Sequence, residues 1–189
     1  SFFDLRALRD FIATLKKTGG TAHLMGLVSD GGVHGHLTHI LAAAKAVTDA
    51  GVPVALHAVT DGRDVAPKSA YGYLGELQEN LPAGAKIGTV CGRYFAMDRD
   101  NRWGRVSEAY AAMIKGEGRR VSSAHDAVTH AYNQSETDEF IGSSVVGDYA
   151  GAQDGDGFFC LNFRADRARE ILRAIGEPGF AEFDTGPRP

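Results

Sequence analysis

The sequence predicts an α/β fold, a three-layer sandwich with a mainly parallel sheet covered by helices on both faces. Short apolar runs of strand length alternate with longer segments whose apolar residues recur every three or four positions. Gly, Asp and Pro residues separate these segments. With 189 residues, of which 43% are apolar and 23% charged, the chain has the size and composition of one globular domain.

Three strand–helix units follow an N-terminal amphipathic helix, whose apolar stripe lies within 5–15. The strands are continuous apolar runs, which is typical of a sheet buried on both faces. Pro67 is expected to open the helix after the second strand, because a missing N–H costs least at the first helical position. In chain order, the predicted elements are strand 23–28, helix 37–47, strand 53–59, helix 67–81, strand 86–90 and helix 103–115.

The chain is less regular between residues 117 and 156. Ser123, with Asp126 three residues later, is expected to cap a short helix that reaches Tyr132. The remaining predicted elements are a peripheral strand at 140–146, an exposed turn at 147–157, a buried strand at 158–163 and a helix at 164–175. The last thirteen residues contain three prolines. We therefore expect one domain, 1–176, followed by a linker, 177–189.

The composition argues against several classes of function. A net charge of −4 disfavours general affinity for nucleic acids, which normally requires a basic face. Lys45 and Asp49 interrupt the longest apolar stretch, so we expect no membrane span. No basic start followed by an apolar segment is found, so we expect no secretory signal and a cytoplasmic protein. Cys91 and Cys160 lie in apolar runs, as buried free thiols do in a reducing compartment.

Charged and polar residues follow the carboxyl end of each predicted parallel strand. Because the loops after such strands emerge at one edge of the sheet, where ligands bind, we expect them to converge. Arginine presents a planar fork of donors that matches carboxylate and phosphate oxygens in pairs. The sequence therefore predicts an anion site, with solvated loops whose Asp and Arg residues pair with one another as the alternative. The loops are 30–34, 61–64, 93–105 and 162–167.

Individual residues in these loops have distinct candidate roles. Arg164 and Arg167 lie three apart in the first turn of a helix, so they share a face where free backbone N–H groups also favour an anion. Asp64 either accepts a hydroxyl proton from a ligand or orients Arg63. His34, on a turn, is a candidate for a hydrogen bond to a substrate oxygen.

His34, His36 and His39 invite a metal-site interpretation. Their spacings of two and three residues across a turn do not match the i, i+4 pair of helical zinc ligands. We therefore expect no metal in this chain. A P-loop and a Ser or Cys nucleophile with a recognisable base are also missing from the sequence. The chain is predicted to grip a small polyanion without breaking a bond, which suggests half of an active site.

The loops closely resemble those of the cofactor-independent (2,3-bisphosphoglycerate-independent) phosphoglycerate mutase family. The matching stretches are 23–34, Asp61-Gly62-Arg63-Asp64, Gly92-Arg93-Tyr94, 97–103 and Asn162-Phe163-Arg164-Ala165-Asp166-Arg167. In this family, an alkaline-phosphatase-like domain holds two metal ions, typically manganese, and a phosphorylated serine. A second domain, inserted into the first, holds the glycerate. This chain resembles the inserted, phosphotransferase domain alone.

The resemblance implies the glycerate-holding part of an enzyme that interconverts 3-phosphoglycerate and 2-phosphoglycerate, in glycolysis and gluconeogenesis. The phosphoserine and both manganese ions would lie in the absent domain, towards which the linker would return, and the isolated chain would be inactive. Asp64 or His34 would exchange the hydroxyl proton. The alternatives are a stand-alone phosphate- or carboxylate-binding module and a metal-dependent phosphohydrolase. By resemblance, the substrate contacts are His34, Arg63, Asp64, Arg93, Arg99, Arg164 and Arg167.

Overall fold

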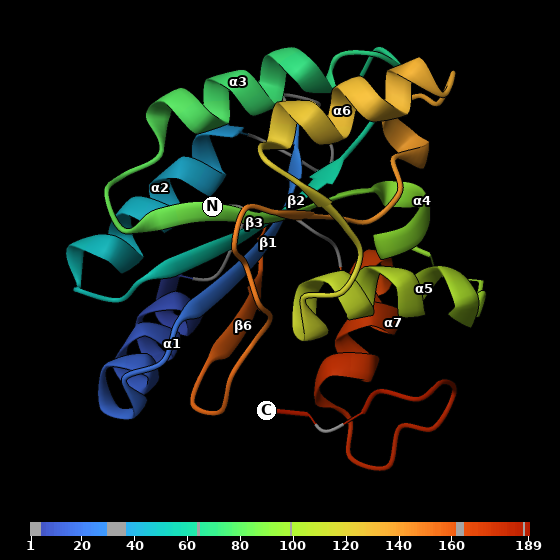
Figure 1. Ribbon diagram of the computed structural model, residues 1–189. Coiled ribbons are helices and arrows are strands. Elements are labelled where there is room, and N and C mark those ends of the chain that lie inside the picture. Colours follow the sequence, from blue (N-terminus) through green and yellow to red (C-terminus); the bar gives the residue numbers. More distant parts are fainter. Residues whose placement is uncertain (1–4, 30–36, 64, 99, 162–164, 187) are drawn as a thin grey trace.

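The computed structural model describes residues 5–29, 37–63, 65–98, 100–161, 165–186 and 188–189, and it leaves the side chains of 5 and 165–168 outside that description. In these ranges, six strands form one sheet in the order β4-β5-β3-β2-β1-β6 (Figure 1). All neighbouring pairs are parallel except β3 and β5. The predicted, mainly parallel sheet is confirmed. The strands are β1 (Ala22–Val28), β2 (Val54–Thr60), β3 (Ala85–Gly92), β4 (Arg119–Val121), β5 (Ser144–Val146) and β6 (Gly157–Cys160).

Helices cover both faces of the sheet, as predicted (Figure 1). Helices α1, α2, α3 and α6 pack on one face, and α4, α5 and α7 pack on the other. None of the helices in the described ranges has the length and apolarity needed to cross a membrane. The helices are α1 (Leu5–Thr18), α2 (Leu37–Asp49), α3 (Ala70–Asn80), α4 (Arg93–Ala96), α5 (Trp103–Tyr110), the π-helical turn η1 (Ala111–Lys115), α6 (Ala124–Asn133), the 3-10 turn η2 (Asp138–Phe140) and α7 (Ala165–Gly176).

The central strands are buried on both sides. In β1, Leu24 and Val28 contribute to the core under α1, α2, α3 and α6, whereas Met25 and Leu27 contribute to the core under α4, α5 and α7. Each large apolar side chain that is fully buried contributes about 1.5–3 kcal/mol. Burial on both faces explains why these strands are continuous apolar runs rather than alternating ones.

Helix α3 begins later than predicted, at Ala70 rather than at Pro67. The reason is a distant cap. Asp138 Oδ2 accepts the backbone N–H groups of Ser69, at 2.7 Å, and Ala70, at 2.8 Å. The peripheral strand expected at 140–146 is also shorter, because residues up to Phe140 belong to η2 and the strand starts at Ser144.

Two local predictions in the second half are confirmed. Ser123 Oγ accepts the backbone N–H of Asp126 at 3.2 Å and caps α6. The helical segment predicted at 103–115 ends where expected, since η1 stops at Lys115 and Gly116 follows it with a left-handed φ of 66°. A Cβ at Gly116 would lie 2.5 Å from the carbonyl carbon of Ala150, so the position requires glycine.

The segment after α7 folds back against the helices. Phe180 lies 5.3 Å from the Trp103 ring and Phe183 lies 5.5 Å from the Tyr110 ring, measured between centroids. Arg188 Nη1 donates to the carbonyl oxygen of Ala174 at 3.1 Å. These contacts tie the segment to the domain, and its role as a linker stays a prediction.

Hydrogen-bonded side chains run across the strands from Asp156 to Thr89. His23 Nε2 lies 2.8 Å from Asp156 Oδ2, His23 Nδ1 lies 2.9 Å from His57 Nε2, and His57 Nδ1 lies 2.8 Å from Thr89 Oγ1. An ionised carboxylate only accepts, so His23 donates from Nε2 and accepts at Nδ1. His57 then donates from Nε2 and accepts the Thr89 proton at Nδ1. One neutral tautomer of each ring therefore satisfies the whole series.

This arrangement predicts that the two imidazoles stay neutral. Burial lowers the pKa of His57 well below 6.5, and burial also lowers the pKa of His23, although Asp156 opposes that shift. Because the unfolded rings bind protons more readily, their contribution to stability is present above pH 6.5 and is lost as the pH falls below it. In an NMR titration between about pH 7.5 and 5.5, the His57 ring resonances should not move. His57 ring resonances that move over this range would contradict the neutral series.

Candidate anion-binding site

A buried ion pair joins the ends of β2 and β3. Asp61 and Arg93 directly follow these strands and are 2% and 4% exposed. Arg93 Nη1 donates to Asp61 Oδ1 at 2.9 Å. The same carboxylate accepts from Ser29 Oγ, just after β1, at 2.9 Å and from the backbone N–H of Arg63 at 3.0 Å. Asp61 thus ties together the ends of three neighbouring strands and fixes the direction of the Arg93 guanidinium.

Arg63 is held more loosely than Arg93. Its side chain is 57% exposed, and its Nε lies 3.6 Å from Glu139 Oε1. An exposed ion pair of this kind contributes about 0–1 kcal/mol. Glu139 belongs to η2, which is held against the end of β3 because the N–H of Gly92 donates to the carbonyl oxygen of Ile141 at 2.8 Å. The Arg63 guanidinium can therefore exchange this acid for a ligand anion at little cost.

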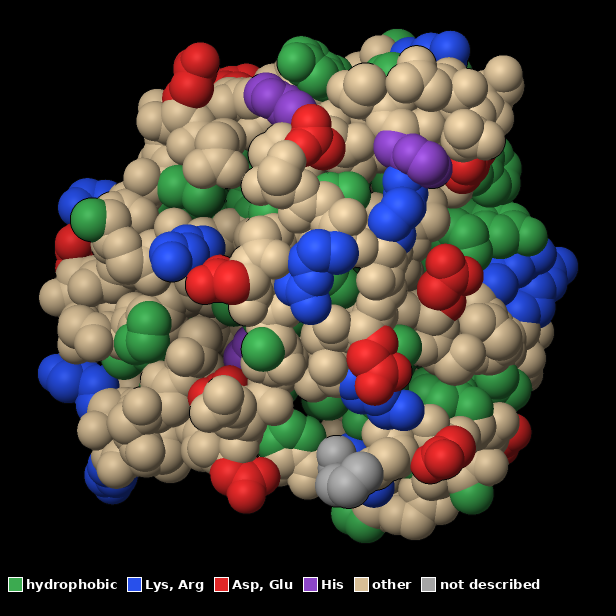
Figure 2. Space-filling view, viewed as in Figure 1, with side chains coloured by type: hydrophobic (Ala, Val, Ile, Leu, Met, Phe, Trp, Pro, Cys, Tyr) green, Lys and Arg blue, Asp and Glu red, His purple; other side chains and the backbone are tan. Residues whose placement is uncertain are grey.

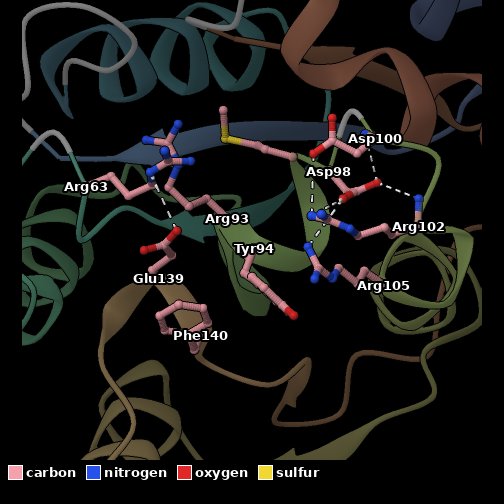
Figure 3. Close-up of a pocket in the computed structure, with 10 residues that line it drawn as sticks. Arg63, Arg93, Tyr94, Asp98, Asp100, Arg102, Arg105, Glu139 and Phe140 are labelled. Carbon is pink, nitrogen blue, oxygen red and sulfur yellow. Dashed lines mark hydrogen bonds and ion pairs between the residues drawn. The ribbon is translucent and has the colours of Figure 1, made fainter.

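Both arginines line a cavity of about 500 Å³ at the carboxyl edge of the sheet (Figure 3). Small-molecule sites usually measure about 300–1,000 Å³, so the cavity accommodates a ligand. Arg63, Arg93 and Glu139 lie on one side of it, and Asp98, Asp100, Arg102 and Arg105 lie on the other (Figure 3). The cavity is lined by Arg63, Arg93, Tyr94, Met97, Asp98, Asp100, Arg102, Arg105, Glu139 and Phe140.

Asp98 organises the segment 97–105, called here the arginine loop, of which residue 99 lies outside the description. The Asp98 side chain is 2% exposed. Oδ2 accepts the backbone N–H groups of Arg102, at 2.9 Å, and Asp100, at 3.3 Å. Oδ1 lies 3.5 Å from Arg105 Nη1 and 3.9 Å from Arg102 Nη1. One carboxylate therefore holds the turn of the loop and two of its guanidinium groups.

Aromatic rings support the basic side chains. The Arg105 guanidinium carbon lies 3.7 Å above the centroid of the half-buried Tyr94 ring, a cation–π contact of about 0.5–2 kcal/mol. The Phe140 ring lies 4.9 Å from that of Tyr94. Elsewhere, on the face shown in Figure 2, basic and acidic side chains are interspersed. Four arginines and three acids line the cavity, so guanidinium groups are concentrated there although the chain as a whole carries −4.

Two chemical roles can be tested against the described residues. Burial raises the pKa of the Cys91 thiol to about 12, and it does the same for Cys160, so neither supplies a thiolate nucleophile at neutral pH. Among the residues that the structure describes, no three His, Cys, Asp or Glu side chains gather closely enough to hold a metal ion. The carboxylates of the cavity instead face guanidinium groups, as Asp98 and Glu139 do.

Comparison with known proteins decides the family. A family model described as "BPG-independent PGAM N-terminus" matches residues 1–189. The chain belongs to the BPG-independent phosphoglycerate mutase family. The resemblance read from the four loops is confirmed. The family description also states independence from 2,3-bisphosphoglycerate as a cofactor.

Individual phosphoglycerate mutases agree with this assignment. The 2,3-bisphosphoglycerate-independent phosphoglycerate mutases of Ruegeria pomeroyi and Paracoccus denitrificans are 74% and 66% identical to the chain. Both alignments cover 100% of the chain and 37% of the relative, so the chain spans little more than a third of their length. A crystal structure of Leishmania mexicana phosphoglycerate mutase at low cobalt concentration matches with a TM-score of 0.86 and 32% identity. That match covers 96% of this chain and 36% of the other.

The structure brings two of the predicted substrate contacts together. Arg63 and Arg93 follow different strands and line the same cavity. Arg167 lies in α7, but its side chain is outside the description. The other predicted contacts lie outside the described residues altogether, and these are His34, Asp64, Arg99 and Arg164.

Several cavity residues were not among the predicted contacts. Tyr94, Arg102 and Arg105 belong to the stretch that the sequence marked as basic, but nothing local distinguished them as lining residues. Glu139 and Phe140 come from η2, of which Phe140 alone lies within the predicted strand 140–146. Their place at the cavity depends on the contact between Gly92 and Ile141, which no periodicity in the sequence signals.

Proposed function

We propose that the chain is the glycerate-holding, phosphotransferase domain of a phosphoglycerate mutase that interconverts 3-phosphoglycerate and 2-phosphoglycerate in glycolysis and gluconeogenesis. The observation that supports this most directly is the one cavity that Arg63 and Arg93 share, in a chain of this family. A phosphoglycerate carries a carboxylate and a phosphate on a three-carbon frame. Two separately held guanidinium groups suit a ligand with two separate anionic groups.

The two arginines are suited to different tasks. Arg93 is buried and directed by Asp61, so it offers a fixed donor that needs no reorganisation when the ligand binds. Holding glycerate in place while its phosphate leaves and returns is a positioning effect, and a fixed guanidinium serves it. Arg63 is exposed and weakly paired, so it can follow a group that changes position. We therefore assign Arg93 to the part of the ligand that stays and Arg63 to the part that moves.

The remaining contacts are proposed from the family resemblance. They are His34, Asp64, Arg99, Arg164 and Arg167, which together with Arg63 and Arg93 would surround the substrate. In the transfer step, the hydroxyl that receives the phosphate gives its proton to Asp64 or His34. The hydroxyl that is released takes a proton back, so the reaction needs no net acid or base.

The rest of the enzyme lies outside this chain. We propose that an alkaline-phosphatase-like domain of the same full-length polypeptide supplies the phosphorylated serine and two manganese ions. When bound, those ions would stabilise charge on the transferring phosphoryl group. Residues 177–189 would form the connection towards that domain, and the enzyme would act in the cytoplasm without nucleic acid or membrane partners.

Replacing Arg63 by alanine in the full-length enzyme tests the proposed function. Arg63 is exposed, so the variant should fold normally. Loss of a charge-assisted hydrogen bond of about 1.5–3 kcal/mol should raise the KM for 3-phosphoglycerate roughly ten- to a hundredfold. Arg9→Ala, which removes an exposed arginine of α1, is the matched control and should behave like the unmodified enzyme.

Two other outcomes would replace the proposal. A full-length protein that binds 3-phosphoglycerate but shows no mutase turnover with manganese would favour the stand-alone anion-binding module. Stoichiometric release of inorganic phosphate, with no 2-phosphoglycerate formed, would favour the phosphohydrolase. Turnover by the isolated chain would contradict the division of labour between two domains.

A further inference from the structure

A buried carboxylate on α7 contacts the arginine loop without lining the cavity. Glu170 is 4% exposed, and its Oε2 accepts the backbone N–H of Asn101 at 3.0 Å. Asn101 has a φ of 59°, in the left-handed region that few residue types adopt without cost. The hydrogen bond therefore holds the loop at a residue with a left-handed backbone conformation. It joins two segments that are 69 residues apart in the sequence.

The Glu170 carboxylate lies beside a second carboxylate, that of Asp98. Its Oε1 is buried and accepts no hydrogen bond from the described residues. Asp98 has the guanidinium groups of Arg102 and Arg105 and two backbone donors as partners. Glu170 has the single backbone donor of Asn101. Because two adjacent carboxylates do not both ionise without a large cost, the proton that they share resides on Glu170.

We propose that protonated Glu170 is a positioning residue that latches the arginine loop to helix α7, donating from Oε1 to Asp98 and accepting at Oε2 from Asn101. The inference rests on the proposed function, because Arg99 in the loop and Arg167 in the helix are both assigned to the substrate. A latch between the two segments fixes the loop relative to the helix. Glu170 itself touches no substrate in this arrangement.

The charges around the latch determine how it responds to pH. Burial, followed by the charges of Asp98 and Asp100, raises the pKa of Glu170 from 4.5 to about 7, against the opposing effect of the Asn101 N–H. The stabilisation from the latch is therefore fully present below pH 4.5 and is lost as the pH rises through about 7. Above that pH a second negative charge faces Asp98.

The other described charged groups near the latch do not compensate for the loss of the Glu170 proton. Arg102 and Arg105 face Asp98 from the start of α5. On α7 itself, Arg173 is one turn away and is paired with Glu177 at 2.7 Å. These pairs keep the three guanidinium groups engaged when Glu170 ionises.

The test compares the full-length enzyme with its Glu170→Gln and Glu170→Ala variants across the pH range. Glutamine is neutral at every pH and keeps one donor and one acceptor, so it reproduces the protonated latch. We expect the KM of the unmodified enzyme, relative to that of Glu170→Gln, to rise by about fivefold or more between pH 6 and 8.5, with kcat changing less. Glu170→Ala should have a raised KM at every pH. Taking the ratio removes any pH dependence that the variants share.

Glu177→Gln is the matched control, because it makes the same chemical change on the same helix at a half-exposed residue away from the loop. Its KM should follow the unmodified enzyme at each pH. A KM ratio between the unmodified enzyme and Glu170→Gln that stays constant across the range would overturn the latch. So would a Glu170→Ala variant with an unchanged KM.

Hydrogen exchange separates failure of the latch from failure of the proposed function. In the substrate-free full-length protein, the Asn101 amide should exchange faster in the unmodified protein than in Glu170→Gln at pH 8.5, and equally in both at pH 6. This difference supports the latch even if the protein proves to have no mutase turnover. Equal exchange at both pH values would overturn it, whatever the turnover.

Discussion

Replacing Arg93 by alanine in the full-length enzyme should lower kcat/KM for 3-phosphoglycerate by about a hundredfold or more, because a desolvated, directed charge is lost from the cavity. The same change should lower the free energy of unfolding by about 3–5 kcal/mol, since it removes the guanidinium that forms an ion pair with a buried negative charge. That charge is Asp61, which is 2% exposed and lies 2.9 Å from Arg93. Steady-state kinetics and urea unfolding measure the two effects.

A double variant separates the two effects. Arg93→Met keeps much of the side-chain volume, and Asp61→Asn removes the negative charge that the Arg93 guanidinium offsets. The new side-chain amide can still accept the Arg63 N–H and donate to the Ser29 hydroxyl, so most of the lost unfolding free energy should return. The kinetic defect should remain. If turnover returns together with stability, Arg93 has a structural role alone and the proposed function loses its central contact.

The part of the fold that follows local rules was predictable. Apolar runs buried on both faces identified the strands that became β1, β2 and β3, and glycine ended the third helix unit at Gly116. Parallel strands send their following loops to one edge, which is why Arg63 and Arg93, which follow different strands, could be expected in one place. The structure confirms that expectation for these two residues.

The rest depends on contacts between distant segments. The short strand β4 carries no apolar run, and β5 pairs antiparallel with β3, so neither follows the pattern of the other strands. Helix α3 starts where Asp138 caps it from almost seventy residues away. A carboxylate that caps a helix remotely has no spacing by which the sequence can reveal it.

The candidate site also has a part that the sequence predicts and a part that depends on contacts between distant segments. Arginines were readily identified because their number and their place after strands are visible in the sequence. The buried acids around them were not, since Asp61, Asp98 and Glu170 gain their roles from burial beside particular donors. Whether a carboxylate is solvated, paired or protonated is a property of its surroundings in the folded chain.

Replacing Gly92 by alanine should destabilise the domain by roughly 3 kcal/mol, through overpacking of one backbone segment against another. A Cβ at this position would lie 2.2 Å from the carbonyl oxygen of Glu139 and 2.7 Å from the amide nitrogen of Ile141. Both are backbone atoms, so no side-chain rotation can relieve the clash. Displacing η2 would also move the Glu139 carboxylate from Arg63, so the KM for 3-phosphoglycerate should rise.

Gly72→Ala is the matched control for Gly92→Ala. It makes the same substitution inside α3, where a Cβ would have nothing within 4 Å. Alanine in a helix interior is favoured over glycine by about 0.5–1 kcal/mol, so this variant should unfold at a higher urea concentration than the unmodified protein. The two substitutions add the same methyl group, which clashes with backbone atoms at Gly92 but meets no atom within 4 Å at Gly72, where the helix preference of alanine then sets the sign. A Gly92→Ala protein as stable as Gly72→Ala would mean that η2 does not pack directly on the end of β3, and the wall that Glu139 and Phe140 contribute to the cavity would have to lie elsewhere.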